Sequence, residues 1–591
     1  MKQFFGAFFG SIIGMVVATL LAVFVVVAIV KSSVSSAFND KSNTTMVKEN
    51  SILKIEFDGP IKERESENPF KALAKGSPFE GNNDMGLNTL LKKIDYAAKD
   101  NKIKGLYLNF KSPEIGFAAA QEIRAALMQF KNKGKFIYAY AESYSQSAYY
   151  MASVANKVYL NPQGEMDWKG INMSLMFFKQ TLNKLDVEMQ IFRHGKFKSA
   201  IEPFMLDKMS EANRYQSETF LNSIWNNMLI DISKSRKIEV AELNKMANEL
   251  RIQFPENALG NLIDQTAYED EVMNDLKKKI NQKESDKINL TSIDKYEVKS
   301  EAKPSRNLAK IAVIYANGSI SSGEGNDDEI GSSTLVKAIR EARTDEKVKA
   351  IVLRVNSPGG SALASDVIWR EVVLAKKSKP VIVSMGNLAA SGGYYISCGA
   401  NHIFAEPNTI TGSIGVFGIL PNIQKMLQNK FGITIDTVNT NLHSDIGTAL
   451  RPVDKQEFQF IQSSVEKVYD TFTKRVAEGR GMPQAMVDSI GQGRVWSGAD
   501  AIRIKLVDEL GGLNDAIAYA AKQIKATDYK LLELPKQKNP LDEFLGNKES
   551  DLETKMLKNN LGPAYTYFKQ MKSVLMLKGV QARLPFEIVF N

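Results

Sequence analysis

Two glycine-containing turns carry the residues of this 591-residue chain that are best suited to covalent chemistry. Ser391 stands in an Ala-Ser-Gly-Gly turn between an apolar, strand-like run and a Tyr-rich helical stretch. Residues 357–360, Ser-Pro-Gly-Gly, form a second turn of the same kind. Glycine lets the backbone approach a substrate closely, and unpaired amides at such turns can hold an oxyanion. The two turns therefore predict acyl transfer on a serine; the alternative is a serine that only packs in a tight turn.

The base that would activate Ser391 is either a histidine or a lysine. The chain has only three histidines, which are His194, His402 and His443. Residues 193–204, RHGKFKSAIEPF, supply Lys196 and Lys198 in a segment apolar enough to be buried. Burial lowers the pKa of a lysine, which is what a lysine base requires. The alternative is a surface Lys198 paired with Glu202, four residues further along a helix.

The composition argues against several other kinds of site. A single cysteine excludes a disulfide framework and a Cys-rich zinc or iron–sulfur centre, and three histidines leave little material for a metal site. The chain has no P-loop, no HExxH motif and no dinucleotide glycine fingerprint, so we expect no cofactor and no metal. The net charge of +9 is spread over the whole length, so nucleic acid is not an expected partner.

An internal duplication positions the two turns. Three pairs of segments match at a spacing of 244 or 245 residues, namely 103–116 with 348–360, 135–153 with 379–397, and 261–266 with 505–510. Apolar strand-like runs alternate with helical stretches in both copies, which predicts βαβ units around a parallel sheet. We therefore expect an α/β protein in which one module occurs twice.

The two copies differ at the residues that matter for chemistry. Ser147 stands at the position of Ser391 but lacks the two following glycines, and residues 114–115, Glu-Ile, replace the Gly-Gly of the other turn. Conversely, Ser444 stands at the position of Lys198. The copy with the Gly-flanked serine lacks the lysine, and the copy with the lysine lacks the glycines. Such complementary loss predicts one active site assembled between the two modules.

The N-terminal region is strongly apolar. Residues 4–30 form an uncharged run of 27 residues. As a helix this run would be about 40 Å long, enough to cross a hydrocarbon core of about 30 Å. A cleavable signal peptide would have a shorter apolar region, and a buried soluble helix would show a polar face. We expect a transmembrane anchor, while lysines on both sides leave its orientation open.

The expected organisation follows from these features. It comprises an anchor (1–31), a polar tether (32–50), a first repeat with the lysine (51–285), a linker (286–308), a second repeat with the serine (309–530) and a C-terminal extension (531–591).

Five motifs together resemble the long, duplicated form of the signal peptide peptidase A (protease IV) family of membrane-anchored Ser/Lys peptidases. They are FKSAIEPF (197–204), NSPGG (356–360), AASGGYYIS (389–397), TGSIGVFG (411–418) and GRVWSGADA (493–501). The resemblance implies tandem crotonase/Clp-protease-like domains behind one transmembrane helix. It makes Ser391 the nucleophile and Lys198, not Lys196, the general base. Gly360 and Gly392 would bind the oxyanion, with Gly359 as the alternative to Gly360.

The resemblance also implies partners and a location. The substrates would be apolar peptides such as signal-peptide remnants, and the protein would be a homo-oligomer, a tetramer in the family. It would be anchored by a single span in the bacterial inner membrane, with the catalytic region in the periplasm. Two other classes stay open: a crotonase-like acyl-CoA enzyme, which also uses paired backbone amides, and a non-catalytic membrane scaffold.

Overall fold

The structure is a computed structural model that describes residues 14–15, 47–65, 85–298, 308–537, 565 and 579–584. The predicted anchor, apart from residues 14 and 15, and most of the predicted tether therefore lie outside the described residues. Among the helices in the described ranges, none is both long enough and apolar enough to cross a membrane.

The first half of the chain folds around a seven-stranded parallel sheet of order β2-β1-β3-β4-β5-β7, with β8 beside β1. Its strands are β1 (Ser51–Lys62), β2 (Met85–Gly86), β3 (Ile103–Glu114), β4 (Phe136–Tyr144), β5 (Lys157–Met166), β7 (Gln265–Thr266) and β8 (Leu290–Ser292). The central strands are buried on both faces: Leu106 and Leu108 belong to one apolar cluster and Tyr107 to another. Burial on both faces explains why these strands are almost continuously hydrophobic.

The second half builds an eight-stranded sheet of order β18-β16-β14-β12-β9-β20, to which β15 and β19 attach through β14. Its strands are β9 (Ala309–Asn317), β12 (Val348–Ser357), β14 (Val381–Ala390), β15 (His402–Ala405), β16 (Ile410–Gly412), β18 (Val495–Ser497), β19 (Glu509–Leu510) and β20 (Tyr529–Leu534). Its pairings are parallel except that between β16 and β18.

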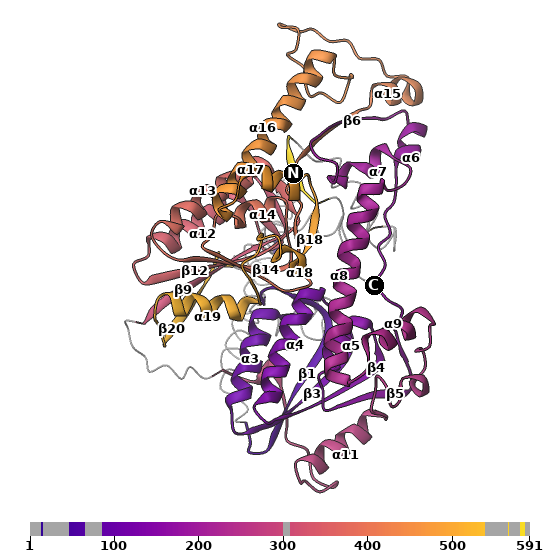
Figure 1. The fold of residues 1–591 in the computed structure, drawn as a ribbon, viewed down its shortest axis with the longest axis vertical. Helices are drawn as coiled ribbons and strands as arrows, with labels where there is room; N and C mark the ends of the chain where they lie inside the picture. Colours follow the sequence, from indigo (N-terminus) through magenta and orange to yellow (C-terminus); the bar gives the residue numbers. More distant parts are fainter. Residues whose placement is uncertain are drawn as a thin grey trace, which may run out of the picture.

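The helices repeat at the same spacing as the sequence. Helices that correspond start 244 or 245 residues apart: α3 (Leu87–Lys99) with α12 (Ser332–Thr344), α4 (Phe117–Asn132) with α13 (Ala362–Lys376), α8 (Glu211–Arg236) with α16 (Lys455–Arg480), and α11 (Glu269–Lys279) with α19 (Leu513–Gln523). Figure 1 shows the two α/β units stacked along the long axis, with α8 running beside both. The predicted duplication of an α/β module with parallel sheets is confirmed.

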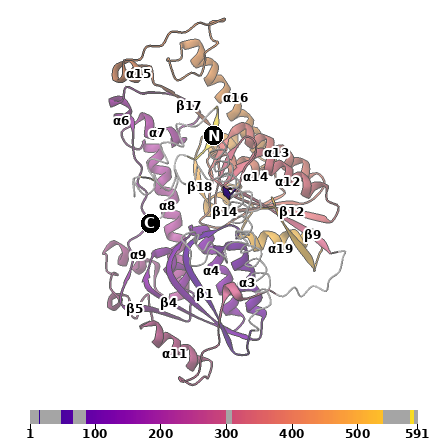
Figure 2. The same cartoon turned by 180° about the vertical axis from the view of Figure 1, so that it is seen from behind.

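A third sheet joins the two units, in the order β11-β10-β13-β21-β17-β6. Its strands are β6 (Glu188–Arg193), β10 (Ser319–Ser321), β11 (Glu329–Gly331), β13 (Gly359–Ser361), β17 (Phe417–Asn422) and β21 (Gln581–Arg583). β6 comes from the first half of the chain and pairs antiparallel with β17 of the second, from Arg193·Phe417 to Glu188·Asn422. Figure 2 shows β17 from behind, at the level of α7 (Glu202–Met205) of the first unit.

Buried charges also hold the two units together. The guanidinium of Arg354 on β12 is only 1% exposed and contacts two carboxylates of the first unit. Its Nε donates to Glu63 Oε2 at 2.8 Å, and its Nη2 donates to Glu122 on α4. Nearby, the backbone N–H of Ala119 donates to Asn387 Oδ1 at 3.0 Å. The interface therefore contains specific polar contacts within a few residues of the Ser-Pro-Gly-Gly turn.

Two predicted segments contain more structure than expected. Part of the predicted linker (286–308) belongs to the first sheet, because β8 pairs with β1 and the side chains of Ile293 and Tyr296 are buried. The predicted extension (531–591) begins inside β20 and contains β21. Such strands are stabilised by pairing with strands that are distant in the sequence, which local composition does not reveal.

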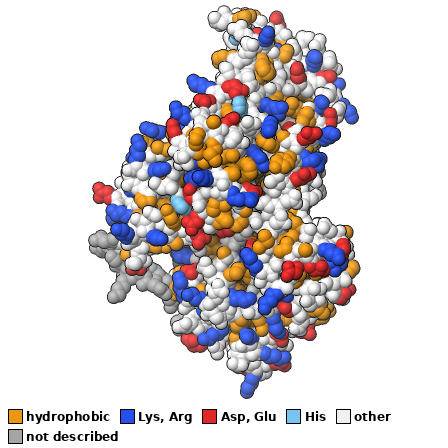
Figure 3. Space-filling model, viewed as in Figure 1, with side chains coloured by type: hydrophobic (Ala, Val, Ile, Leu, Met, Phe, Trp, Pro, Cys, Tyr) orange, Lys and Arg blue, Asp and Glu red, His pale blue; other side chains and the backbone are white. Residues whose placement is uncertain are grey.

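Charged groups of both signs are mixed over the surface. In the face shown in Figure 3, Lys and Arg side chains alternate with Asp and Glu, and hydrophobic side chains lie between them. No large area of a single charge is visible on that face, in agreement with the scattered basic residues of the sequence.

Candidate active site

Ser391 lies at the junction between β14 and the short helix α14 (Gly392–Ser397). Its backbone has φ 55° and ψ −112°, a conformation that residues other than glycine seldom adopt. Its N–H donates to Gly412 O at 2.8 Å, its Oγ to Gly415 O at 3.3 Å, and its side chain is fully buried. Strain of this kind persists where the surroundings fix it, and it aims the hydroxyl at one place.

The structure brings Lys198 to Ser391. Lys198 follows β6 and precedes the 3-10 helix η2 (Ser199–Ile201), so the pairing of β6 with β17 carries it into the second unit. Its Nζ lies 2.9 Å from Ser391 Oγ within the same chain, and its side chain is 1% exposed. Lys196, in contrast, is exposed, with its Nζ 5.1 Å from the centre of the Phe197 ring.

The surroundings of Lys198 favour its neutral form. Burial holds the pKa of the Lys198 amine well below its ordinary value, because the charged form loses its hydration. Besides Ser391, its Nζ contacts Ser413 Oγ at 3.2 Å and Ser413 O at 3.5 Å, which are neutral groups. A neutral amine at hydrogen-bonding distance from a hydroxyl can accept its proton.

The alternative partner of Lys198, Glu202, is engaged elsewhere. Its carboxylate accepts hydrogen bonds from Ser210 N–H at 3.1 Å, from Ser210 Oγ and from Asn213 Nδ2 at 2.9 Å. These contacts hold the start of α8 against α7, and Glu202 is 1% exposed. The alternative prediction, a surface ion pair between Lys198 and Glu202, is therefore wrong.

The sequence did not single out Ser413, the second hydroxyl at the amine. It lies within TGSIGVFG, which is interpreted from sequence as one motif of the family resemblance. Ser413 also has a positive φ of 50°, and its N–H donates to Arg494 O at 2.7 Å. Its position between Gly412 and Gly415 could have marked Ser413 as a turn residue. Its separation of 215 residues from Lys198 does not predict that the two side chains are in contact.

The two predicted glycine turns lie against each other. Gly359 has φ +93°, and a Cβ added to it would stand 2.6 Å from Gly392 N. A Cβ added to Gly392 would stand 3.1 Å from Gly359 Cα and 2.7 Å from Ser365 Oγ. The N–H of Gly359 already donates to Ser357 Oγ at 3.1 Å. Because that bond occupies the Gly359 amide, Gly360 is the better candidate of the two for an oxyanion donor.

The matching region of the first unit has a different geometry. β3 continues through Glu114, whereas its counterpart β12 stops at Ser357 and a separate strand, β13, begins at Gly359. Ser147 lies in the first turn of α5 (Gln146–Ala152), with its Oγ 3.3 Å from that of Ser145, the N-cap residue. The first unit therefore does not form a second turn of the Ser391 type.

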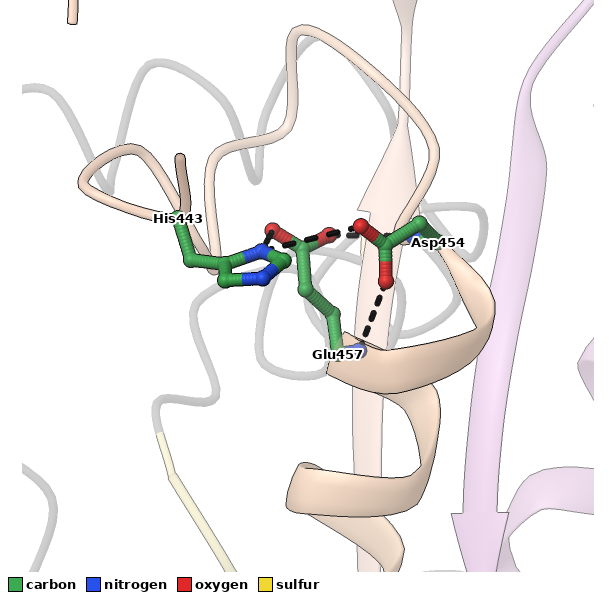
Figure 4. A group of neighbouring side chains, drawn as sticks. All are labelled: His443, Asp454 and Glu457. Atoms are coloured by element: carbon green, nitrogen blue, oxygen red, sulfur yellow. Dashed lines mark hydrogen bonds and ion pairs between the residues drawn. The ribbon is translucent and has the colours of Figure 1, made fainter. Parts of the chain in front are cut away.

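The three histidines are bonded to carboxylates outside this site. His194, His402 and His443 contact Glu466, Glu509 and Glu457, respectively. Figure 4 shows His443 beside Glu457 and Asp454 at the start of α16, a group whose donor atoms are close enough together to hold a metal ion. Arg451 already binds Glu457 with both Nη atoms, so this cluster has a structural explanation in the cap of α16. A lysine, not a histidine, is thus the basic group at Ser391 Oγ.

Comparisons with known proteins match the duplicated architecture. The profile described as Peptidase family S49 matches residues 129–283 and again 374–527, one segment in each copy, and that described as Clp protease matches residues 302–411. The chain is 36% identical over 509 residues to Protease 4 of Salmonella typhi, covering 83% of this chain and 81% of that protein.

Other relatives agree over similar lengths. Protease 4 of Haemophilus influenzae is 39% identical and covers 73% of this chain and 72% of its own length. Serine protease SPPA, chloroplastic, of Arabidopsis thaliana is 31% identical and covers 85% of this chain and 74% of its own. With two matched segments and relatives that align over most of both chains, this chain belongs to peptidase family S49 and is a serine peptidase of the long, duplicated signal peptide peptidase A type.

Proposed function

We propose that this peptidase works with a Ser/Lys dyad, in which Ser391 is the nucleophile and Lys198 is the general base. The observation that supports the proposal most strongly is the distance of 2.9 Å between Lys198 Nζ and Ser391 Oγ, two buried atoms from different copies of the repeat. The lowered pKa of Lys198 supports it further, because only the neutral amine can take a proton.

The proposed reaction is acyl transfer. Neutral Lys198 takes the proton of Ser391 Oγ while the oxygen attacks the scissile carbonyl carbon. The N–H groups of Gly360 and Gly392 donate to the oxyanion that forms. Lys198 then gives the proton to the leaving amine, and later takes one from the water that hydrolyses the acyl ester. For the first step the Ser391 hydroxyl must turn its proton from Gly415 O to Lys198 Nζ, which already lies 2.9 Å from Ser391 Oγ.

The substrates and location of the enzyme are proposed from the sequence. Residues 4–30 are uncharged and long enough to anchor the chain, which would keep the site near peptides left in a membrane. We take apolar peptides such as signal-peptide remnants as the substrates, in the periplasm at the bacterial inner membrane. An oligomer, such as a tetramer, is proposed from the resemblance to its family.

A covalent serine probe tests the dyad. We expect a fluorophosphonate to label the wild-type chain at Ser391, as identified by peptide mass spectrometry, and to leave Ser391→Ala unlabelled. Lys198→Ala should slow labelling and peptide hydrolysis on the order of 10²–10⁴-fold, the usual contribution of a general base. Lys196→Ala is the matched control, because Lys196 is exposed and should leave both rates unchanged.

Two results would contradict the proposal. Peptide hydrolysis that persists in both Ser391→Ala and Lys198→Ala would show that the dyad does not carry the reaction. Acyl-CoA thioester turnover that survives Ser391→Ala would favour the crotonase-like alternative, since that chemistry needs amide donors but no serine.

A further inference from the structure

Tyr469, on α16 of the second unit, contacts the segment of the first unit that ends at Lys198. Its ring stacks on that of His194, with 3.7 Å between the ring centres. Its hydroxyl oxygen accepts a hydrogen bond from Gln492 N–H at 3.1 Å. Gln492 O in turn accepts one from Phe197 N–H at 3.0 Å. This one buried side chain therefore holds the segment at two positions, once directly and once through Gln492.

The loop at residues 491–494, which contains Gln492, also contacts the backbone of Lys198. Gly493 has φ +84°, and a Cβ added to it would stand 2.6 Å from Lys198 N and 2.7 Å from Lys198 Cβ. A Cβ added to Gly195 would stand 2.5 Å from Gln492 O. Gln492 itself has a positive φ of 53°, which is uncommon for a residue with a side chain. Because these backbones are in such close contact, a shift of the 491–494 loop would displace Lys198.

The 491–494 loop also fixes the groups on the other side of the dyad. Two backbone hydrogen bonds of 2.7 Å join it to residues 413–414. Ser413 Oγ contacts Lys198 Nζ at 3.2 Å, and the nearby Gly415 O accepts a hydrogen bond from Ser391 Oγ at 3.3 Å. The loop therefore lies between the backbone of the lysine and the segment that contacts both reacting atoms.

The Tyr469 hydroxyl connects this loop to a second helix. It donates to Asp488 Oδ1 at 2.6 Å, on α17 (Gln484–Ile490), which Figure 1 shows close to α16. Burial and the bond to Asp488 raise the pKa of Tyr469, so the phenol keeps its proton and uses it in that bond. The lone pairs of the oxygen are then available to accept from Gln492 N–H.

The first copy of the repeat keeps the contact between helices but not the bond to the loop. Trp225 stands 244 residues before Tyr469, and Asn244 stands 244 residues before Asp488. Trp225 Nε1 donates to Asn244 Oδ1 at 2.9 Å, as Tyr469 does to Asp488. An indole N–H can only donate, whereas a phenol oxygen also accepts. A donor is thus enough to join the helices, and the accepting oxygen occurs in the copy that has the Gly-flanked serine.

We propose that Tyr469 is a positioning residue for the general base: its hydroxyl fixes, through Gln492, the loop that places Lys198 Nζ at Ser391 Oγ. The inference rests on the proposed roles of Ser391 and Lys198. A misplacement of about 1 Å in a catalytic group can lower the rate about 100-fold. Loss of the hydroxyl should therefore slow the chemical step and leave the binding of the substrate unchanged.

Tyr469→Phe tests this role, because it removes the hydroxyl and keeps the ring on His194. We expect kcat for an uncharged apolar peptide to fall on the order of ten- to a hundredfold at an unchanged KM, and fluorophosphonate labelling of Ser391 to slow by a similar factor. Tyr159→Phe is the matched control: it removes a buried hydroxyl that donates to Asp275 Oδ2 at 2.8 Å, on β5 of the first unit, and should leave both rates unchanged. Urea unfolding of the two variants compares their stabilities.

A double variant separates positioning from a general weakening of the fold. In the Lys198→Ala background, Tyr469→Phe should slow the residual labelling of Ser391 no further, because the amine that it positions is absent. Three results would overturn the positioning role while the dyad stands: an unchanged kcat in Tyr469→Phe, an equal loss of activity in Tyr159→Phe, or the same slowing of labelling with and without Lys198. If Lys198→Ala alone does not slow labelling, the dyad fails and this inference fails with it.

Discussion

The chemistry available to Lys198 depends on what surrounds its amine. Among the described residues, the partners of its Nζ are two serines and the side chain is buried, so none of the carboxylates in that part of the chain compensates a positive charge there. The protein therefore keeps this lysine neutral at a pH where an exposed lysine is protonated. The same feature has consequences for activity and for stability.

Activity should rise with pH. Because burial lowers the pKa of Lys198, the neutral fraction grows as the pH increases through that lowered value and then stays constant. We expect kcat/KM for an uncharged apolar peptide to rise along one ionisation and reach a plateau below about pH 10, the ordinary range of lysine. A pH–rate profile of the wild-type enzyme measures this. A kcat/KM that falls steadily as the pH rises over the same range would contradict a lysine base.

The free energy of unfolding should also increase with pH. Between the lowered pKa of folded Lys198 and the ordinary value of about 10.4, the unfolded chain binds one more proton, so stability increases with pH. Replacing the amine in Lys198→Met should raise the free energy of unfolding at neutral pH by about 1–3 kcal/mol, a typical cost of burying a polar group. The gain should shrink as the pH approaches about 10.

Urea unfolding at several pH values measures this effect. Lys196→Met is the control, because the same substitution at an exposed lysine should give no gain that varies with pH. An inactive Lys198→Met that is less stable than wild type at neutral pH would show that the amine contributes to stability, contrary to the expectation.

At the scale of elements, one strand pairing and one turn create the site. The pairing of β6 with β17 places Lys198 beside Ser391. The break between β12 and β13 forms the glycine turn at residues 357–360. In the first unit, β3 runs on without that break. The turn depends on Gly359, which has a positive φ and no space for a side chain beside Gly392 N.

Gly359→Ala should strongly reduce activity. The added Cβ would stand 2.6 Å from Gly392 N and would push apart the two turns that are proposed to bind the oxyanion, so kcat should fall on the order of 10²–10³-fold, as when one oxyanion donor is lost. Gly260→Ala is the matched control, because Gly260 also has a positive φ, +77°, but open space around its Cβ position. Both variants carry backbone strain of about 1 kcal/mol, whereas only Gly359→Ala should lose activity, measured as peptide hydrolysis beside thermal unfolding. Equal activities of the two variants would rule out a role for this turn in catalysis.

Several parts of this arrangement follow from the sequence and others do not. The comparison of the two copies points to Ser391 and to a lysine of the first copy, because each copy has lost what the other kept, and the family resemblance selects Lys198 over Lys196. The alternation of apolar runs also predicted the parallel sheets, since buried strands need continuous hydrophobicity. These inferences rest on patterns within one copy or at one fixed spacing.

What the sequence could not predict depends on contacts between distant segments. β6 meets β17 and β21 meets β13 through backbone bonds, and such pairings leave no mark in the composition of either strand. Ser413 contacts Lys198 across 215 residues, so no local spacing connects them. Likewise, the sequence places residues 290–292 in a predicted linker, because this short run forms a strand, β8, only beside β1.

At the scale of the whole molecule, the active site requires the two units to keep one fixed orientation. Arg354 contributes to this orientation, because it lies on β12 of the second unit and binds Glu63 and Glu122 of the first. All three side chains are less than 9% exposed, and Arg354 is three residues before Ser357, where the strand breaks. A buried charge network loses much stability when one member is removed.

Arg354→Met should destabilise the protein by about 3–5 kcal/mol, because it leaves two buried carboxylates without their cation. The midpoint of urea unfolding measures the loss. Lys99→Met is the control: it breaks an exposed ion pair with Asp95 of similar length, 2.8 Å, and should change stability by no more than about 0.5 kcal/mol. Equal shifts of the midpoint in the two variants would show that the buried network does not hold the units together.

The pairing of β6 with β17 has a consequence for the time at which the enzyme becomes active during synthesis. The proposed base and nucleophile are separated by 193 residues, and β17 leaves the ribosome after both of them. A nascent chain of which only the first unit has been synthesised contains Lys198 but not yet Ser391. At the common pace of about 5–20 residues per second, the ribosome needs on the order of ten seconds or more to bridge that interval. Throughout that interval the growing chain cannot form the proposed dyad, and a chain truncated before Ser391 never forms it.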